Sequence, residues 1–173
     1  TLSQVVTGLD NYYLGEAHDP ATGYYTGAGE PPGRWAGSGV AALGLDAAST
    51  VDPEDFRRLY RAEAPDGSGP LRHTDKRSVP AFDLTASAPK SVSAIWALAD
   101  APTRDAVEQA HHEAVGAALA YLEQEACRTR YRNHGDINNT QVRGRGFVAA
   151  TFDHRTSRAG DPQLHTHMVV ANV

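Results

Sequence analysis

Hydrophobic and polar residues alternate along three stretches of the chain, and this pattern predicts three β-strands. The stretches are Val79–Ala86, Asn139–Asp153 and Gln163–Val173. Successive side chains of a strand point to opposite faces of a sheet, so each stretch presents one apolar and one polar face. The turn-forming run 154–162 lies between the last two stretches and predicts a hairpin. Gly144 and Gly146 are expected to mark a bulge or a close approach of two backbones.

A spacing of three to four residues between apolar positions predicts helices elsewhere in the chain. The clearest covers Thr103–Glu125. A second helix is expected after Ser87, which is a suitable N-cap, and a third from Asp52 to Ala62. The chain therefore carries both kinds of element, with the helices concentrated between the first two predicted strands.

The pattern of elements predicts an α+β fold with a mainly antiparallel central sheet flanked by helices. The chain has 173 residues and is 40% hydrophobic, which is typical of a single domain, 1–173, with its own core. Near the N-terminus a short helix is expected at Thr7–Leu14, and the glycine-rich and proline-rich run Gly27–Gly39 is expected to be a loop. The chain ends directly after a predicted strand, so we expect it to be a fragment of a longer protein.

Composition narrows the setting in which the protein works. No apolar run approaches the length of a transmembrane helix, and no secretion signal is visible, so membrane insertion is not expected. The single cysteine, Cys127, cannot form an internal disulfide and fits a reducing cytoplasm.

The charge is unevenly distributed. The net charge is −5, but the segment from Arg128 to Arg158 holds seven arginines and two aspartates and is +5. An acidic body with one basic segment can still bind a polyanion, because the local potential governs encounter. A solvated, arginine-rich surface is the alternative explanation.

Three histidines near the end of the chain predict a metal site. His165 and His167 are two residues apart on a predicted strand and therefore face the same way, and the hairpin brings His154 alongside them. Three imidazoles leave coordination positions open for a substrate, which is what a catalytic metal needs. The alternative is that the histidines are structural or surface residues. The adjacent pair His111 and His112 is expected in solvent, because neighbours on a helix share no face.

Asp83 is the best candidate for an acid that orients one of these histidines. It lies on a predicted strand, on the face opposite Phe82 and Leu84. Metal-bound histidines usually need a hydrogen-bond acceptor for the N–H of their second ring nitrogen, and a carboxylate orients the ring most strongly. A surface acid is the alternative. The expected cofactor is a divalent metal ion: three imidazoles accept zinc, manganese, nickel or copper, and magnesium is a further candidate.

Four sets of motifs, in consistent order from about Asn11 to Val173, resemble the MobF class of conjugative relaxases, which belong to the HUH endonuclease superfamily. The matching runs are Tyr12-Tyr13 and Tyr24-Tyr25 ahead of Gly33-Arg34-Trp35 and Ala41–Leu45, then Phe82–Ser93, His154–Arg158 and Asp161–His167.

The resemblance implies a site-specific and strand-specific DNA nickase that acts at a plasmid origin of transfer. In that reading, a tyrosine attacks the scissile phosphate and keeps the 5′ end as a phosphotyrosine. Tyr12 is the implied first nucleophile and Tyr24 the candidate for a second transfer step, with Tyr13 and Tyr25 as weaker alternatives. His154, His165 and His167 are the implied metal ligands, and Asp83 is the acid that orients one of them and assists the nucleophile.

The implied partners are single-stranded and hairpin DNA of the origin, together with relaxosome accessory proteins and a coupling protein. The residues expected to contact DNA are Arg128, Arg130, Arg132, Arg143, Arg145, Arg155, Arg158 and Lys90. The spacer between the tyrosine pairs is longer than the family pattern leads us to expect. Alternatives are a replication initiator or transposase of the same superfamily, a non-catalytic single-strand binding module, and a hydrolytic metalloenzyme.

Overall fold

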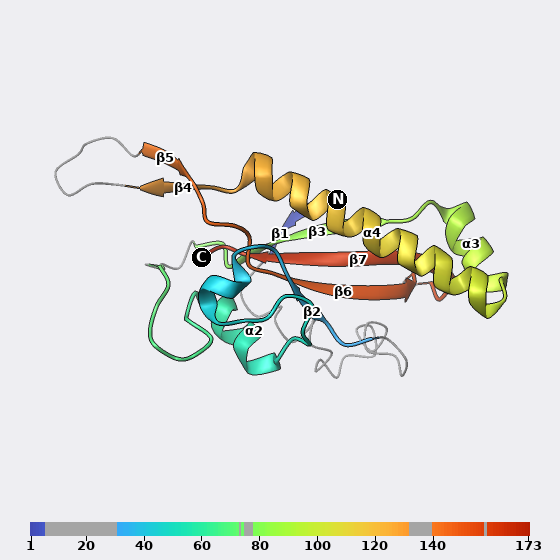
Figure 1. Ribbon diagram of the computed structural model, residues 1–173, viewed down its shortest axis with the longest axis horizontal. Helices are drawn as coiled ribbons and strands as arrows, with labels where there is room; N and C mark the ends of the chain where they lie inside the picture. Colours follow the sequence, from blue (N-terminus) through green and yellow to red (C-terminus); the bar gives the residue numbers. More distant parts are fainter. Residues whose placement is uncertain (6–30, 73, 75–77, 132–139, 158) are drawn as a thin grey trace.

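The computed structural model describes residues 1–5, 31–72, 74, 78–131, 140–157 and 159–173. Its main feature is a five-stranded antiparallel sheet in the order β1-β3-β7-β6-β2, with β4 and β5 forming a separate two-stranded sheet (Figure 1). The strands of the main sheet are β1 (Leu2–Gln4), β2 (Arg34–Ala36), β3 (Ala81–Ser87), β6 (Ala149–Thr156) and β7 (Pro162–Ala171). The predicted α+β fold with a mainly antiparallel sheet is confirmed.

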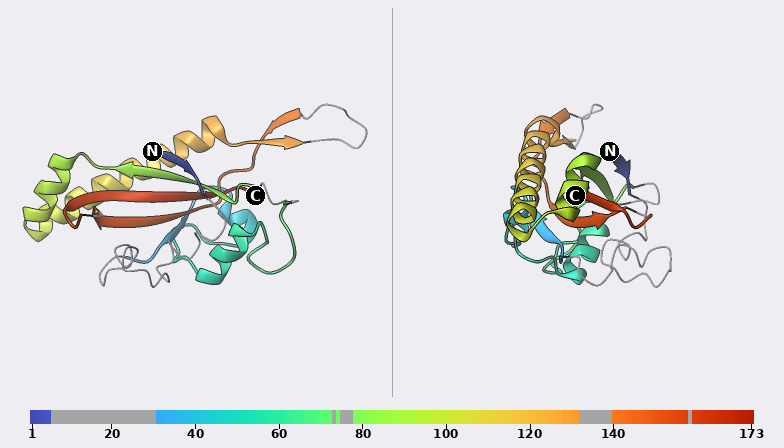
Figure 2. Two further views of the ribbon diagram at one scale, coloured as in Figure 1. Left: turned by 180° about the vertical axis from the view of Figure 1, so that it is seen from behind. Right: turned by 90° about the vertical axis from the view of Figure 1, so that its right-hand side faces the viewer.

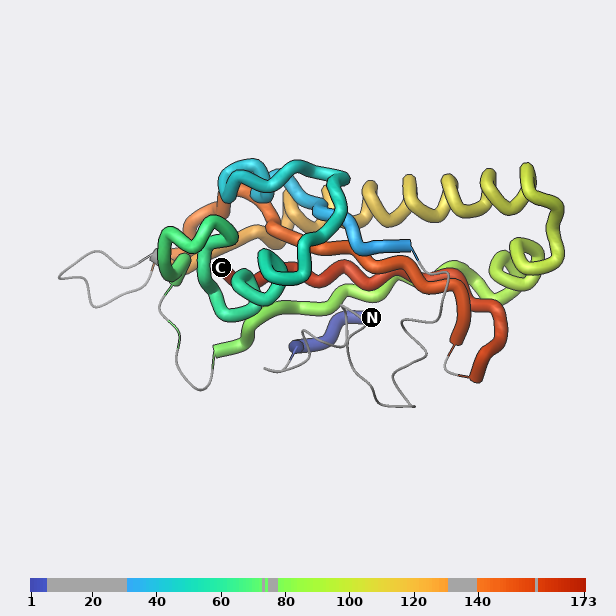
Figure 3. Tube along the Cα trace, turned by 90° about the horizontal axis from the view of Figure 1, so that it is seen from below, coloured from blue at the N-terminus to red at the C-terminus, as the bar shows by residue number. Residues whose placement is uncertain are grey.

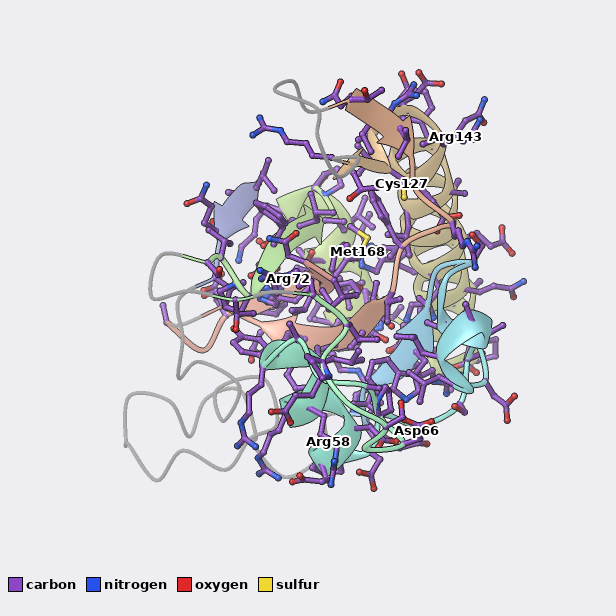
Figure 4. The ribbon with its side chains drawn as sticks, turned by 90° about the vertical axis from the view of Figure 1, so that its left-hand side faces the viewer. Arg58, Asp66, Arg72, Cys127, Arg143 and Met168 are labelled. Atoms are coloured by element: carbon purple, nitrogen blue, oxygen red, sulfur yellow. The ribbon has the colours of Figure 1, made fainter. Side chains whose placement is uncertain are left out.

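Helices cover both faces of this sheet (Figure 2). The long helix α4 (Ala101–Ala126) packs Val115 and Leu119 on one face, which we call the rear face, where Met168 lies in the interior (Figure 4). On the opposite, front face, α2 (Pro53–Tyr60) packs Phe56 against the ring of Phe152, with ring centroids 5.5 Å apart. The sheet thus has a separate apolar cluster on each face.

All three helix predictions that fall within the described residues are confirmed, and one predicted cap is wrong. Helix α2 begins where expected, because the Asp52 side chain accepts hydrogen bonds from the N–H groups of Glu54 and Asp55. Helix α3 (Lys90–Leu98) starts later than predicted. Ser87 is the last residue of β3 rather than an N-cap, and Pro89 takes the cap position without a side-chain hydrogen bond. The residue before a proline favours extended backbone, which lengthens the strand at the expense of the helix.

The predicted strand Asn139–Asp153 is wrong as a single element. Its first part is β5 (Thr140–Arg143), which pairs with β4 (Arg128–Tyr131) in the hairpin that extends beyond the main sheet, and its last part belongs to β6. Between them Gly146 has a φ of +127°, and a Cβ on Gly144 would lie 2.5 Å from the sulfur of Cys127. Gly146 therefore marks a close approach to the backbone of Gly39 and Gly144 a close approach to the Cys127 side chain, as expected, and both lie where the predicted strand divides.

Three short elements carry too few residues to show a pattern. The first, β1, pairs with β3. The second, β2, lies inside the run Gly27–Gly39, for which a loop is expected, and pairs with β6. The third, η1 (Val40–Leu43), is a 3-10 helix that follows this run. Trp35 of β2 is buried in the front core. The predicted helix Thr7–Leu14 lies outside the described residues.

A hydrogen-bonded glutamate ties the C-terminal part of α4 to the rest of the fold. Glu123 accepts hydrogen bonds from the backbone N–H of Ser38 at 2.9 Å and of Phe147 at 2.8 Å, and also from the Ser38 hydroxyl. None of the helices in the described part of the chain has both the length and the apolar character that crossing a bilayer demands.

Candidate metal centre

The rings of His154, His165 and His167 meet on the front face of the sheet. Their centroids form a nearly equilateral triangle, with separations of 5.2 Å, 5.2 Å and 5.3 Å. The register explains this arrangement, because His154 and His165 are directly opposite each other on β6 and β7, and His167 lies two residues further along β7. The β-hairpin predicted from the sequence is therefore what brings the three together.

The triangle has the dimensions of a three-histidine metal site. A metal–nitrogen bond of about 2.1 Å puts each ring centre about 3 Å from the ion, so ligands at tetrahedral angles have ring centres about 5 Å apart. Within the described residues, no three histidine, cysteine, aspartate or glutamate side chains already have the geometry of a metal site. Binding therefore requires the rings to turn about their side-chain bonds, while the strands hold their spacing.

Asp83 lies against one member of the triangle. It is on β3, next to β7, and its Oδ2 is 2.8 Å from Nδ1 of His167. Both residues are more than nine-tenths buried. A ring that donates through Nδ1 carries its lone pair on Nε2, so the carboxylate fixes the tautomer in which Nε2 can bind a metal. The hydroxyl oxygen of Thr85 is a more distant neighbour of the same nitrogen, at 3.4 Å.

The other two rings are also prepared for a cation. Nδ1 of His165 is 2.9 Å from the carbonyl oxygen of Gln163, a contact in which the nitrogen donates. Burial lowers the pKa of His154 to about 4, with further lowering by His167 and His165. Near neutral pH the His154 ring is consequently uncharged, which is the form that binds a metal.

A model of the family described as TrwC relaxase matches residues 7–173. The chain belongs to the TrwC relaxase family. The multifunctional conjugation protein TraI of Escherichia coli is 40% identical over 169 residues, which is 96% of this chain and 8% of that protein.

Solved structures of relatives have the same fold. A metal-bound structure of the conjugative relaxase TrwC in complex with oriT DNA is 34% identical, with a TM-score of 0.76. A copper-bound complex of TrwC with oriT DNA is 32% identical, also with a TM-score of 0.76. Each match covers 99% of this chain and 57% of the TrwC chain. This chain thus spans a small part of TraI and somewhat more than half of the solved TrwC chains.

The described part of this TrwC-family chain contains some of the predicted site residues and not others. Tyr12, Tyr13, Tyr24 and Tyr25 lie outside the described residues, as do Arg132 and Arg158.

The arginines that lie within the described residues do not form one continuous surface stripe. Arg128, Arg130 and Arg143 lie on the β4–β5 hairpin, with Arg145 just beyond it, whereas Arg155 follows His154 near the C-terminal end of β6. The hairpin and that end of β6 are at opposite ends of the molecule (Figures 1 and 3). Figure 4 looks onto the hairpin end, where Arg143 is labelled.

Two of the predicted DNA-contacting residues already have protein partners. The Arg155 guanidinium is 3.3 Å from Glu108 and 6.0 Å from the centre of the Trp96 ring. Lys90 forms an ion pair with Asp161 and donates to the carbonyl oxygen of Pro162 at 2.8 Å. Lys90 therefore ties the start of α3 to the turn between β6 and β7.

The expectation that His111 and His112 are solvated is wrong for His111, which is half-buried; His112 is exposed as expected, although it also contacts the sheet. Nε2 of His111 is 3.0 Å from the hydroxyl oxygen of Thr166, and Nε2 of His112 is 2.9 Å from Oδ2 of Asp153. Burial lowers the pKa of His111. Although the two histidines are adjacent on α4, the helix lies across two strands, and each ring reaches a different one. The sequence carries no local signal for this contact.

Proposed function

We propose that this chain is the DNA-nicking part of a conjugative relaxase, which cleaves one strand at a plasmid origin of transfer and so initiates conjugative transfer. The observation that carries the proposal is the triangle of three histidine rings with Asp83 behind it, in a chain of the TrwC relaxase family. The solved TrwC relatives are complexes with oriT DNA, which is the substrate class proposed here.

His154, His165 and His167 are the residues that would hold a divalent metal. Zinc, manganese, magnesium, nickel and copper are candidates, and relatives have been solved in metal-bound and copper-bound forms. When bound, the ion supplies Lewis-acid chemistry by neutralising charge on a phosphate oxygen. Asp83 fixes the orientation and tautomer of His167, and burial keeps His154 neutral.

The proposed nucleophile is Tyr12. Its phenolate oxygen forms a bond to the scissile phosphorus while the bond to the 3′ oxygen breaks, and the 3′ oxygen leaves as a hydroxyl after taking up a proton. The 5′ end stays on the protein as a phosphotyrosine, so the reverse step can reseal the strand. Tyr24 is proposed for a second transfer step, with Tyr13 and Tyr25 as alternatives.

The β4–β5 hairpin is proposed to bind the DNA backbone. Arg128 is directly opposite Arg143 in the hairpin, and Arg130 lies on the same face two residues from Arg128. Like charges opposite one another destabilise a strand pair, so a bound polyanion relieves a cost that the free hairpin carries. All three side chains belong to exposed residues. The remaining predicted DNA contacts are Arg132, Arg145, Arg155, Arg158 and Lys90.

Replacing Arg128, Arg130 and Arg143 together by glutamine tests this surface. Affinity for an origin hairpin should fall, and the slope of log affinity against log salt concentration should decrease by about 1 for each arginine that contacts a phosphate. Circular dichroism checks that the variant is folded. An unchanged salt slope would show that these arginines do not face DNA.

The nicking activity is tested with single-stranded origin DNA and a divalent metal. The expected result is a protein–DNA adduct on a denaturing gel, which mass spectrometry maps to Tyr12 and which Tyr12→Phe abolishes without loss of DNA binding. Adducts on Tyr13, Tyr24 or Tyr25 would reassign the nucleophile. A 5′-phosphate product without an adduct would indicate a hydrolytic metalloenzyme, and binding without cleavage would indicate a non-catalytic module.

The biological setting is part of the same proposal. Cleavage confined to an origin of transfer supports a relaxase, whereas cleavage at a replication origin or transposon end would support the replication-initiator or transposase alternative. Relaxosome accessory proteins and a coupling protein are the proposed partners, and the cytoplasm is the proposed location.

A further inference from the structure

The two strands that carry the histidines also carry polar residues on the rear face. Asp153 immediately precedes His154 on β6, and Thr166 lies between His165 and His167 on β7. Asp153 and Thr166 are directly opposite each other, in the strand pairing next to that of His154 with His165. At this level of the β6–β7 hairpin, the triangle of histidine rings therefore lies on the front face and the polar pair of Asp153 and Thr166 on the rear face.

Helix α4 binds this polar pair through its two histidines. The Thr166 hydroxyl donates to Oδ1 of Asp153 at 2.5 Å. The oxygen of the Thr166 hydroxyl also accepts a hydrogen bond from Nε2 of His111 at 3.0 Å. His112 donates through Nε2 to the other carboxylate oxygen of Asp153 at 2.9 Å. We call His111, His112, Asp153 and Thr166 the rear clamp.

The rear clamp lies in a place where apolar packing would suffice to attach the helix. His111, Val115 and Leu119 recur every four residues along α4, and the last two pack against the sheet as ordinary core residues. Thr166 is only 1% exposed. Burying a hydroxyl and partly burying a carboxylate costs free energy that hydrogen bonds only offset, and what such a network adds is a fixed geometry. Apolar contacts tolerate small sliding movements, whereas hydrogen bonds do not.

The local strand geometry shows why fixed geometry is needed here. The regular pairing of β6 with β7 ends at His154, where the register shifts before Thr156. His154, the proposed ligand on β6, is thus at the edge of the irregular region. On the far side of His154, Arg155 is held to Glu108 of α4 at 3.3 Å. A cavity of about 20 Å³, room for one water molecule, is lined in part by His111, His112 and Asp153 of the clamp and by the metal-site histidines His154 and His165.

We propose that the rear clamp is a positioning device for the metal centre, which fixes β6 against β7 at the level of the three histidines. Its residues are positioning residues and touch neither metal nor DNA. This inference rests on the metal site proposed above. A ligand set tolerates displacements of only about 0.5 Å, so loss of the clamp should weaken metal binding even when the fold is intact.

The test is metal affinity of the metal-free 173-residue chain, measured by calorimetric titration with Mn²⁺ and with Cu²⁺. Thr166→Val keeps the β-branched shape of the side chain and removes the hydroxyl that links His111 to Asp153. Outer-shell substitutions typically cost 10-fold to 100-fold in metal affinity, and about a 10-fold loss is expected here. Thr166→Ser, which restores the hydroxyl, should recover affinity. The electron paramagnetic resonance spectrum of bound Cu²⁺ should change in Thr166→Val and not in Thr166→Ser.

Val115→Ala is the matched control, because it weakens the same helix–sheet contact without touching a hydrogen bond. It should lower the melting temperature and leave metal affinity unchanged. If Thr166→Val does not fold, His112→Ala at the exposed rim of the clamp replaces it, with a smaller loss of affinity expected.

Two results would overturn the inference. One is wild-type affinity in the folded clamp variants, and the other is an equal loss in Val115→Ala, which would reduce the clamp to general packing. Failure of the wild-type chain to bind either metal would instead refute the metal site itself, and the clamp with it.

Discussion

Removal of Asp83 tests the most direct link between the sheet and the proposed metal centre. In Asp83→Ala, Nδ1 of His167 loses its carboxylate acceptor at 2.8 Å. The ring can then adopt either tautomer or rotate, and the ligating nitrogen becomes less basic. Both changes should weaken metal binding without removing a ligand.

The size of the effect follows from what remains near the ring. Loss of an outer-shell acceptor costs about 10-fold to 100-fold in affinity, or about 1.4 to 2.7 kcal/mol. The Thr85 hydroxyl oxygen, 3.4 Å from the same nitrogen, can replace part of the interaction. A neutral acceptor forms a bond roughly half as strong as a charged one, so we expect the lower end, about 10-fold. Asp83→Asn keeps an acceptor oxygen, so its metal affinity should fall between that of Asp83→Ala and that of the wild type.

Calorimetric titration of the metal-free chain with Mn²⁺ measures this difference, and circular dichroism at the same temperature checks that each variant is folded. His165→Ala, which removes a ligand, is the reference for a larger loss. If Asp83→Ala binds the metal as tightly as the wild type, the carboxylate does not orient His167 and the assignment of Asp83 is wrong.

Two further predictions concern the framework around the site. A Cβ on Gly33 would lie 2.5 Å from the ring of Phe152, which is packed in the front core. Gly33→Ala should therefore lower the free energy of unfolding, measured in urea, by about 1–3 kcal/mol, and Phe152→Leu in the same chain should recover part of that loss. An unchanged unfolding midpoint in Gly33→Ala would contradict this packing. Burial would raise the pKa of Glu123, but hydrogen bonds from Ser38 and Phe147 lower it below the usual 4.5. The charged form therefore stabilises the fold above that pH and loses its contribution as the pH falls through the folded-state pKa. Glu123→Gln should be less stable by about 2 kcal/mol near neutral pH, with a difference that shrinks in acid, and a difference independent of pH would refute this role.

Much of the candidate site could be predicted from the sequence, because a strand alternates its faces every residue. That rule alone places His165 and His167 together, and a hairpin over 154–162 adds His154. The same rule places Asp83 on the polar face of its strand. These predictions needed only local geometry, and the structure brings the four residues together as expected.

Other features depend on contacts that no local pattern contains. The strand predicted over Asn139–Asp153 alternates correctly, yet it divides because the chain must pass Cys127 and Ser38 at two glycines. The split separates the hairpin arginines from Arg155, which the charge count had grouped together.

The triangle of histidine rings was determined by the sequence, since strand periodicity is a property of the backbone itself. The hydrogen bonds on the rear face, behind the triangle, were decided only by the tertiary structure. His111 and His112 point about 100° apart around a helix, so no reading of the helix alone puts both on the sheet. Only the placement of α4 across β6 and β7 brings one ring to Thr166 and the other to Asp153.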